Sequence, residues 1–175
     1  ARGSTPLVGS SQVSPVIGTV GEFTATGENY APPHEQQPRW RLSGREAELL
    51  ERQRYRLRQV QLEFFRPTGE REALVTAPDC IHDAAQSRAH SGGPLKIESG
   101  DGRAAIEGEG FQWEQTTATL LISNSVRATL QRVITNPPPA PLVITSRWFV
   151  FEITNRRAVF HEQVRGEDGE VEFTC

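Results

Sequence analysis

From Trp40 onward, apolar and polar residues alternate along the chain with a period of two. Val60, Leu62 and Phe64, for example, are each separated from the next by one polar residue. Because successive side chains of a strand point to opposite faces, this alternation is typical of an antiparallel sheet with one buried face. Further alternating runs span 74–77, 95–98, 105–113, 120–130, 142–152, 158–165 and 171–174. The pattern therefore predicts an all-β fold.

Turn-forming residues lie between these runs, as in 67–70 (Pro-Thr-Gly-Glu), 100–102 (Gly-Asp-Gly) and 167–169 (Glu-Asp-Gly). Short strands whose turns recur about every 8 to 15 residues indicate a sandwich or an open roll. Gly108 and Gly110 interrupt one of the runs and predict a β-bulge there.

The first 39 residues differ from the rest, because they are rich in Gly, Ser, Pro and Thr and show little periodicity. They predict a flexible tether at 1–39 ahead of a β domain at 40–175. A short strand at 16–20 is an alternative within the tether. The run of prolines at 137–139 marks a sub-boundary at 136–141 inside the domain.

The segment 45–58 admits two interpretations. Ala47, Leu50 and Leu57 have the heptad-like spacing of an amphipathic helix. Arginine, however, recurs at every second position from Arg54 to Arg58, which a solvated strand face explains and a helix does not. We expect a strand.

An internal repeat is the most informative feature of the sequence. Residues 106–127 match 144–165 without gaps at an offset of 38, and 75–96 fits the same frame at an offset of 31. The repeating unit is a strand, an acidic turn and a second strand. Hairpins that bury one face only against their neighbours predict a stacked, extended structure rather than a closed globule.

The matched positions place one set of apolar side chains on a common inner face. Phe111 and Trp113 share a face of one strand, and Phe149 and Phe151 share the equivalent face of its repeat. The candidate interior consists of Leu62, Phe64, Leu95, Ile97, Phe111, Trp113, Leu120, Ile122, Val126, Phe149, Phe151, Phe160 and Val164. An ordinary sandwich core would produce the same pattern, so the residues alone leave the role of this face open.

Composition and charge remove several function classes. The net charge of -3 gives no general attraction to nucleic acid or anionic lipid, and no apolar run is long enough for a membrane span. The small residues at 1–4 resemble the start left by a removed signal peptide, which would indicate export. Cys80 and Cys175 are far apart in the sequence, and we expect no disulfide between them.

Candidate chemistry is sparse. The sequence has no nucleophile elbow, Walker-type loop, dinucleotide fingerprint or zinc-protease motif, so we expect no enzyme and no cofactor. A metal site is not expected either, because the one cysteine and two histidines at 80–90 are spaced unlike zinc ligands. Glu107 and Glu109 are interpreted as solvated. The arginine stripe at 52–58 lies among glutamates, which argues against nucleic-acid binding.

Two stretches of the chain resemble a known family. Residues 40–47 (Trp-Arg-Leu-Ser-Gly-Arg-Glu-Ala) and 57–65 (Leu-Arg-Gln-Val-Gln-Leu-Glu-Phe-Phe) look like the opening of the LptC domain. Residues 144–174 are similar to an OstA-type repeat, although the family pattern commonly has Gly-Asn where this chain has Glu162-Gln163. The chain thus resembles the periplasmic lipopolysaccharide-transport proteins of the LptC and LptA (OstA-like) type, LptC most of all.

The resemblance implies a V-shaped antiparallel β-roll, or jelly roll, of stacked hairpin repeats. Its apolar interior would shield the acyl chains of lipopolysaccharide, with no catalysis and no cofactor. The implied partners are lipopolysaccharide and other β-roll proteins of the export machinery stacked end to end, LptA-like or transporter periplasmic domains. The implied location is the periplasm, at the inner membrane through an anchor that is missing or separate.

The terminal run offers a candidate interface. Val171 and Phe173 alternate with polar residues, and the run lacks the Pro, Lys or inward charge that normally protects an edge strand. It predicts an edge for β-augmentation by the next roll, unless a neighbouring strand has been truncated from the sequence. The rival function class is a carbohydrate-binding or adhesive β-sandwich of the cell envelope, which exposed aromatic rings on a flat face would favour.

Overall fold

The computed structural model describes residues 16–132, 139–153, 155, 157–167 and 172–174. In this part of the chain the regular structure is β-strand, apart from one short 3-10 turn, η1 (Glu51–Gln53). The strands are β1 (Val16–Val20), β2 (Phe23–Thr26), β3 (Trp40–Gly44), β4 (Glu46–Leu50), β5 (Arg54–Phe65), β6 (Arg71–Asp83), β7 (Arg88–Ser99), β8 (Ala104–Glu114), β9 (Thr119–Leu130), β10 (Leu142–Ser146), β11 (Trp148–Glu152), β12 (Arg157–His161), β13 (Arg165–Glu167) and β14 (Glu172–Thr174). The predicted all-β fold is confirmed.

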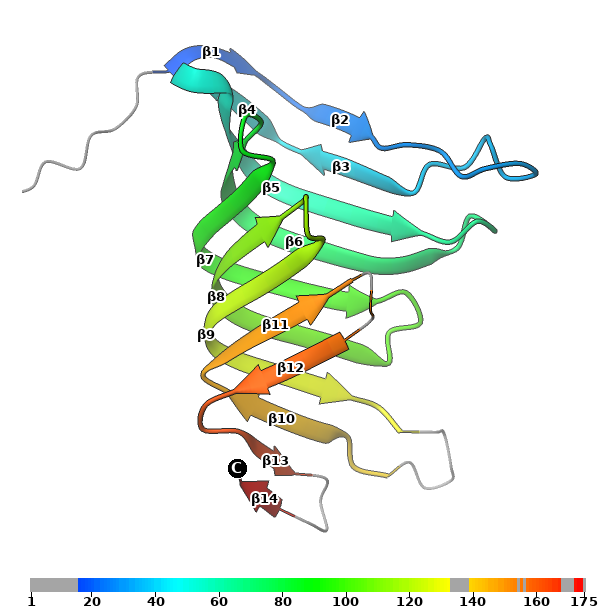
Figure 1. Cartoon of the computed structure of the whole chain (residues 1–175), viewed down its shortest axis with the longest axis vertical. Coiled ribbons are helices and arrows are strands. Elements are labelled where there is room, and N and C mark those ends of the chain that lie inside the picture. Colours follow the sequence, from blue (N-terminus) through cyan, green and yellow to red (C-terminus); the bar gives the residue numbers. More distant parts are fainter. Residues whose placement is uncertain (1–15, 133–138, 154, 156, 168–171, 175) are drawn as a thin grey trace, which may run out of the picture.

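All of these strands belong to one antiparallel sheet built from consecutive hairpins (Figure 1). From β5 to β9, each strand pairs with the strands before and after it in the sequence. At one end β3 and β4 both pair with β5, and at the other β10 and β11 both pair with β9. The sheet is not closed into a barrel, since β1 and β14 lie at opposite ends of its strand order.

The cross-strand register is interrupted near the middle of the long hairpins. The interruptions fall between Thr76 and Ile81, between Ser91 and Pro94, and between Glu107 and Glu109. The last of these confirms the bulge predicted at Gly108 and Gly110. At the same level the shorter strands end and restart, β3 before β4, β10 before β11, and β12 before β13. A line of irregular backbone therefore crosses the whole sheet.

This line divides the sheet into two leaves, and the ribbon curves from one leaf into the other (Figure 1). Leaf A consists of β1, β4, β11, β12 and residues 54–58, 79–83, 88–91, 109–114 and 119–124. Leaf B consists of β2, β3, β10, β13, β14 and residues 60–65, 71–77, 94–99, 104–108 and 126–130.

Small residues occupy the concave side of the bend on the strands that pass from leaf B to leaf A. They are Gly44, Ala77, Gly108 and Ser146, of which the last three are buried. A Cβ atom at Gly108 would lie 2.4 Å from Cγ2 of Ile122, and one at Gly44 would lie 2.5 Å from Cε1 of Phe23. These distances are far below van der Waals contact, so the bend requires the absence of a larger side chain.

Left-handed backbone occurs at the bend on strands that pass from leaf A to leaf B. Gln59 and Ser125 have φ angles of 50° and 52°, and Glu162 and Gln163 have φ angles of 57° and 53°. All four side chains are exposed. Non-glycine residues rarely adopt positive φ, and they do so at bulges and turns. Gln59, Ser125 and Gln163 each directly precede a valine, Val60, Val126 and Val164.

The buried core follows the concave side of the bend. It combines residues of leaf A with residues of leaf B, and Ile122 and Phe149 are completely buried. Its members are Leu57, Val60, Ala77, Cys80, Leu95, Phe111, Leu120, Ile122, Val126 and Phe149. The inner faces of the two leaves therefore pack on one another along the bend.

Several sequence-based expectations can be compared with these strands. The segment 45–58 forms β4, η1 and the start of β5, so the strand interpretation is confirmed. The helix that the spacing of apolar residues suggested does not form, because Arg52 and Gln53 adopt left-handed backbone between two strands. The short strand at 16–20, given as an alternative to the tether, is present as β1.

The tether predicted at 1–39 differs from the structure over its second half. β1 pairs with β4 and β2 pairs with β3, so residues 16–26 belong to the sheet. An edge strand needs little burial to pair its backbone, and the exposed, glycine-containing β1 gave no alternation from which this pairing could be predicted. Residues 1–15 of the predicted tether lie outside the described residues.

The single runs predicted at 142–152 and 158–165 are wrong, because each is divided at the bend. Arg147 separates β10 from β11, and residues 162–164 separate β12 from β13. β10 and β11 pair with β9, so the region after the sub-boundary at 136–141 continues the same sheet. Residues 133–138, which include the first half of that sub-boundary, lie outside the described residues.

The close approach at Gly108 gives a stability test. Gly108→Val should lower the free energy of unfolding by about 1–3 kcal/mol, because the added side chain must displace the buried Ile122. Urea denaturation followed by circular dichroism measures this. Gly92→Val is the matched control, since no atom lies within 4 Å of a Cβ built there. Equal stability of the two variants would show that the bend tolerates a side chain.

Candidate functional site

Two cross-strand rows form the inner face of leaf A. The deep row, next to the bend, consists of Ala47, Leu57, Cys80, Phe111, Ile122, Phe149 and Phe160. The shallow row, one residue pair farther toward the hairpin ends, consists of Leu49, Tyr55, His82, Ala89, Trp113, Leu120, Phe151 and Ala158. Both rows run across the leaf from β4 to β12. Most of their side chains are apolar, but Ser91 of β7 pairs with Phe111 in the deep row, and the shallow row contains Tyr55 and His82.

Leaf B has an equivalent row. It consists of Leu42, Leu62, Val75, Ile97, Ile106, Ala128, Ile144 and Gly166. Leu42, Val75, Ile97 and Ile106 are half-buried and pack against the core. The apolar inner face therefore continues through the bend from one leaf into the other.

The thirteen residues of the candidate interior separate into two groups by burial. Leu95, Phe111, Leu120, Ile122, Val126 and Phe149 are buried in the core. Ile97, Trp113, Phe151 and Phe160 are half-buried and pack against that core, whereas Leu62, Phe64 and Val164 are half-buried outside the cluster. Val164 lies between β12 and β13 rather than inside a strand.

The structure adds core residues that the sequence interpretation left out. Leu57, Val60, Ala77 and Cys80 are buried, and Tyr55 packs against them. The inner face skips two residues at the bend, from Leu57 to Val60 and from Ala77 to Cys80, which interrupts the period of two. Carrying the 31-residue offset back from Gly108 to Ala77 would have indicated these positions.

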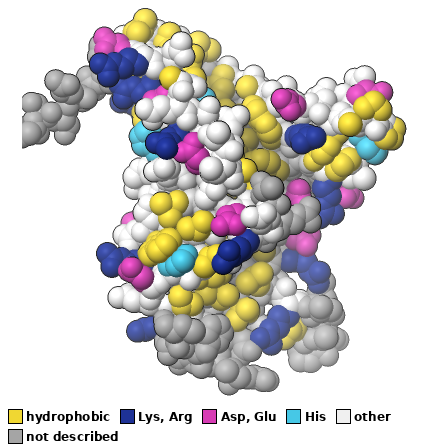
Figure 2. Space-filling view, in the orientation of Figure 1, with side chains coloured by type: hydrophobic (Ala, Val, Ile, Leu, Met, Phe, Trp, Pro, Cys, Tyr) yellow, Lys and Arg dark blue, Asp and Glu magenta, His cyan; other side chains and the backbone are white. Residues whose placement is uncertain are grey.

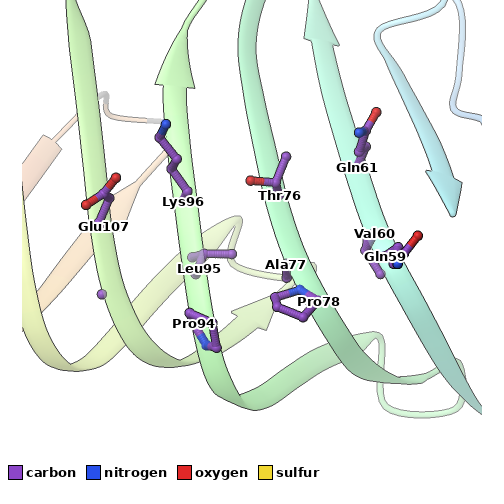
Figure 3. A pocket seen from close by; sticks show the side chains of 11 residues that line it. Gln59, Val60, Gln61, Thr76, Ala77, Pro78, Pro94, Leu95, Lys96 and Glu107 are labelled. Carbon is purple, nitrogen blue, oxygen red and sulfur yellow. The ribbon is translucent and has the colours of Figure 1, made fainter.

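Two hollows lie along the bend. One of about 560 Å³ is lined by Gln61, Thr76, Lys96 and Glu107 and also by the apolar residues Val60, Ala77 and Leu95, of which Leu95 belongs to the predicted interior (Figure 3). A second of about 540 Å³ is lined by Arg45, Glu46, Arg58, Gln59 and Pro78. Lys96 pairs with Glu98 at 3.0 Å and Arg58 pairs with Glu46 at 2.9 Å, so the charges of this surface are largely balanced.

The arginine stripe is part of the same balanced surface. Arg56 lies 3.0 Å from Glu48, and Arg58 contacts both Glu46 and Glu48. Hydrophobic side chains are visible between the charged ones, over β11 and β12 as well as over the upper strands (Figure 2). Among the described residues, no three His, Cys, Asp or Glu side chains are close enough to hold a metal ion. Cys80 and His82 lie in the inner rows, whereas His90 is exposed.

The edges of the sheet carry different side chains. β1, at one end, has Val16, Ile17 and Val20 exposed at 48 %, 63 % and 60 %. β14, at the other end of the described sheet, pairs through Phe173 with Gly166 of β13. Val171 and Cys175 lie outside the described residues. The expected absence of a disulfide between Cys80 and Cys175 therefore stays a prediction.

No protein-family model matches the chain, and a search of curated proteins finds no match. None of the described residues forms a helix that is long and apolar enough to cross a membrane. The structure defines the chain as an open antiparallel sheet of consecutive hairpins with an apolar inner face.

Burial raises the pKa of the Cys80 thiol to about 12, with a smaller contribution from the Asp79 carboxylate. The thiolate is the reactive form of cysteine. We therefore expect alkylation of Cys80 in the native protein at pH 8 to be slowed on the order of a thousandfold relative to the unfolded chain. Peptide mass spectrometry follows Cys80 separately from Cys175. Equal rates with and without 6 M urea would show that the deep row is accessible to the reagent.

Proposed function

We propose that this protein is a non-enzymatic, periplasmic lipopolysaccharide-binding component of an export bridge. In this proposal it is a V-shaped β-roll of the LptC and OstA-like type, and its inner face shields acyl chains and passes them to the next roll. The location and the partners, lipopolysaccharide and neighbouring β-roll proteins, are part of the same proposal.

The observation that best supports the proposal is a decrease in burial across the apolar inner face. Aromatic side chains are buried at the bend and half-buried elsewhere, and the sheet is not closed into a barrel. Phe111, Ile122 and Phe149 are buried at the bend, whereas Trp113, Phe151 and Phe160 stay half-buried. A closed sandwich core would bury both sets. Half-buried aromatic residues on a concave face are available to pack against an apolar ligand.

The backbone at Glu162 and Gln163, where the bend separates β12 from β13, supports the resemblance on which the proposal depends. The family pattern commonly has Gly-Asn at the position of Glu162-Gln163, and both residues here have positive φ. Glycine and asparagine are the residues that adopt this conformation most readily. The chain therefore keeps the conformation that the pattern favours while departing from its residue types.

The energetics of such a face suit transfer rather than storage. Moving a methylene group from water into an apolar site is favourable by about 0.8 kcal/mol. A chain that comes from a bilayer gains almost none of this, because lipid tails are as apolar as leucine. An open apolar face can therefore accept an acyl chain and release it to an equivalent neighbour.

The carbohydrate-binding alternative receives less support. It requires exposed aromatic rings on a flat face, but Trp40, Trp113 and Trp148 are all half-buried. The ring of Trp148 is moreover stacked on His161, with the ring centroids 3.7 Å apart. A sugar could bind to this side of the indole only by displacing the imidazole.

Photo-crosslinking tests the lipid proposal directly. A photoreactive amino acid at Trp113, Phe151 or Phe160 should crosslink to lipopolysaccharide, because these side chains are half-buried on the inner face. The control is the same probe at Gln112, which is exposed and adjacent to Trp113 in β8. Mobility-shifted adducts detected with an antibody to lipopolysaccharide give the readout. Equal labelling at Gln112 and Trp113 would contradict an interior lipid site.

End-to-end stacking is tested at the terminal edge. Glu172→Pro or Thr174→Pro should weaken head-to-tail association, because proline removes a backbone N–H from the edge strand. The control, Glu172→Gln, keeps that N–H. Light scattering and partner pull-down measure association, and circular dichroism checks that the sheet stays folded. Unchanged association in both proline variants would exclude β14 as the interface.

A further inference from the structure

Three side chains in the shallow row of leaf A combine an aromatic ring with a polar atom. Tyr55, His82 and Trp113 lie on β5, β6 and β8, and Ala89 of β7 lies between the last two. All three rings are half-buried. The rings of Tyr55 and His82 are neighbours, with centroids 6.3 Å apart. The small Ala89 leaves the space between His82 and Trp113 without a long side chain.

No hydrogen bond joins the polar atoms of these rings to another described residue, and none of these atoms is buried without a partner. The other tyrosine provides a contrast, because the hydroxyl of Tyr30 donates to the carbonyl oxygen of Phe65 at 2.6 Å. Tyr and Trp usually find a partner for O–H and N–H when they are buried. In the shallow row, water or a ligand must supply that partner.

The three rings lie at a boundary between apolar and charged surroundings. On the side of the bend, the deep row next to them contains the buried Leu57, Cys80 and Phe111. On the other side, the strands end with charged residues, including the ion pair between Arg88 and Glu114. Rings with an apolar body and a polar tip are favoured at such boundaries.

Leaf B has no equivalent at the matching level. At the level of the shallow row, the inner face of leaf B carries Leu62, Val75 and Ile97. One residue pair farther toward the hairpin ends, the row contains Trp40, Phe64, Ala73 and Ser99, so polar atoms occur there as well. At the level of the shallow row itself, polar contacts with a ligand would therefore be made by leaf A.

We propose that Tyr55, His82 and Trp113 form a specificity site for a hydroxyl group carried by the acyl chain of the bound amphiphile. The inference rests on the proposed function, because it assumes that acyl chains occupy the inner face. A hydroxyl both donates and accepts hydrogen bonds, which matches a phenol, an imidazole and an indole N–H. Desolvation lowers the pKa of His82, so its ring is neutral near pH 7 and can also do both.

The test compares two soluble probes that differ in one oxygen atom, N-dodecanoyl-glucosamine and N-(3-hydroxydodecanoyl)-glucosamine. The full chain should bind the hydroxylated probe roughly two- to tenfold more tightly, as expected for one additional net hydrogen bond. Tyr55→Phe, His82→Phe and Trp113→Phe each keep an aromatic ring and remove the polar atom. These variants should reduce that preference while binding of the plain probe stays nearly unchanged.

Phe151→Leu is the control in the same row, since it changes apolar packing and no hydrogen bond. It should weaken both probes alike and leave their ratio unchanged. Isothermal titration calorimetry measures the affinities, and thermal unfolding checks each variant. Wild-type protein that binds neither probe would overturn the proposed function itself. Wild-type protein that binds both equally, or ring variants that keep the full preference, would overturn the specificity site alone.

Discussion

The fold depends on how closely strands approach one another on the concave side of the bend. At Gly108 a single carbon atom added to the backbone would collide with Ile122, and Ile122 is completely buried. This contact lets β8 and β9 turn together, so that leaf A and leaf B share one core. With a larger residue at this level the strands would have to straighten or separate, and a flat sheet has no enclosed inner face. The bend and the core that the two leaves share therefore depend on the small residues at positions 44, 77, 108 and 146.

The alternation of residue types was enough to predict strands, hairpins and the repeat, because side-chain periodicity directly reflects which face is buried. It was not enough to locate the bend. There the inner face skips residues, from Leu57 to Val60 and from Gly108 to Phe111, so the period of two restarts in the opposite phase. Across 158–165 the sequence pattern of a single strand continued past Glu162 and Gln163, so it did not indicate the break between β12 and β13. β1 was hard to predict because its side chains are all exposed, so its sequence shows no alternation of apolar and polar residues.

Of the thirteen residues that the repeat placed in the candidate interior, twelve lie on strands and six are buried. Trp113 is among them, whereas Tyr55 and His82 were not predicted, because they lie in a segment dominated by arginine and acidic residues. Their relation becomes visible only when the register places them beside one another and next to Ala89. Cross-strand neighbours of this kind are separated by the length of a hairpin, which a local pattern does not reveal.

The pairing scheme has a consequence for how the chain reaches this structure. Between β5 and β9, each strand pairs with the next strand in the sequence, and only toward the two ends of the sheet do pairs skip intervening strands, as in β3 with β5, β9 with β11 and β10 with β13. Loops that close early and stay short keep the entropic cost of each pairing low, whereas most β-sheet proteins must join remote segments before they gain stability. Folding can therefore start at any hairpin between β5 and β9, and each hairpin that has formed offers an edge on which the next strand can pair. The same locality lets a lineage lengthen or shorten the array by whole hairpins without redesigning the rest.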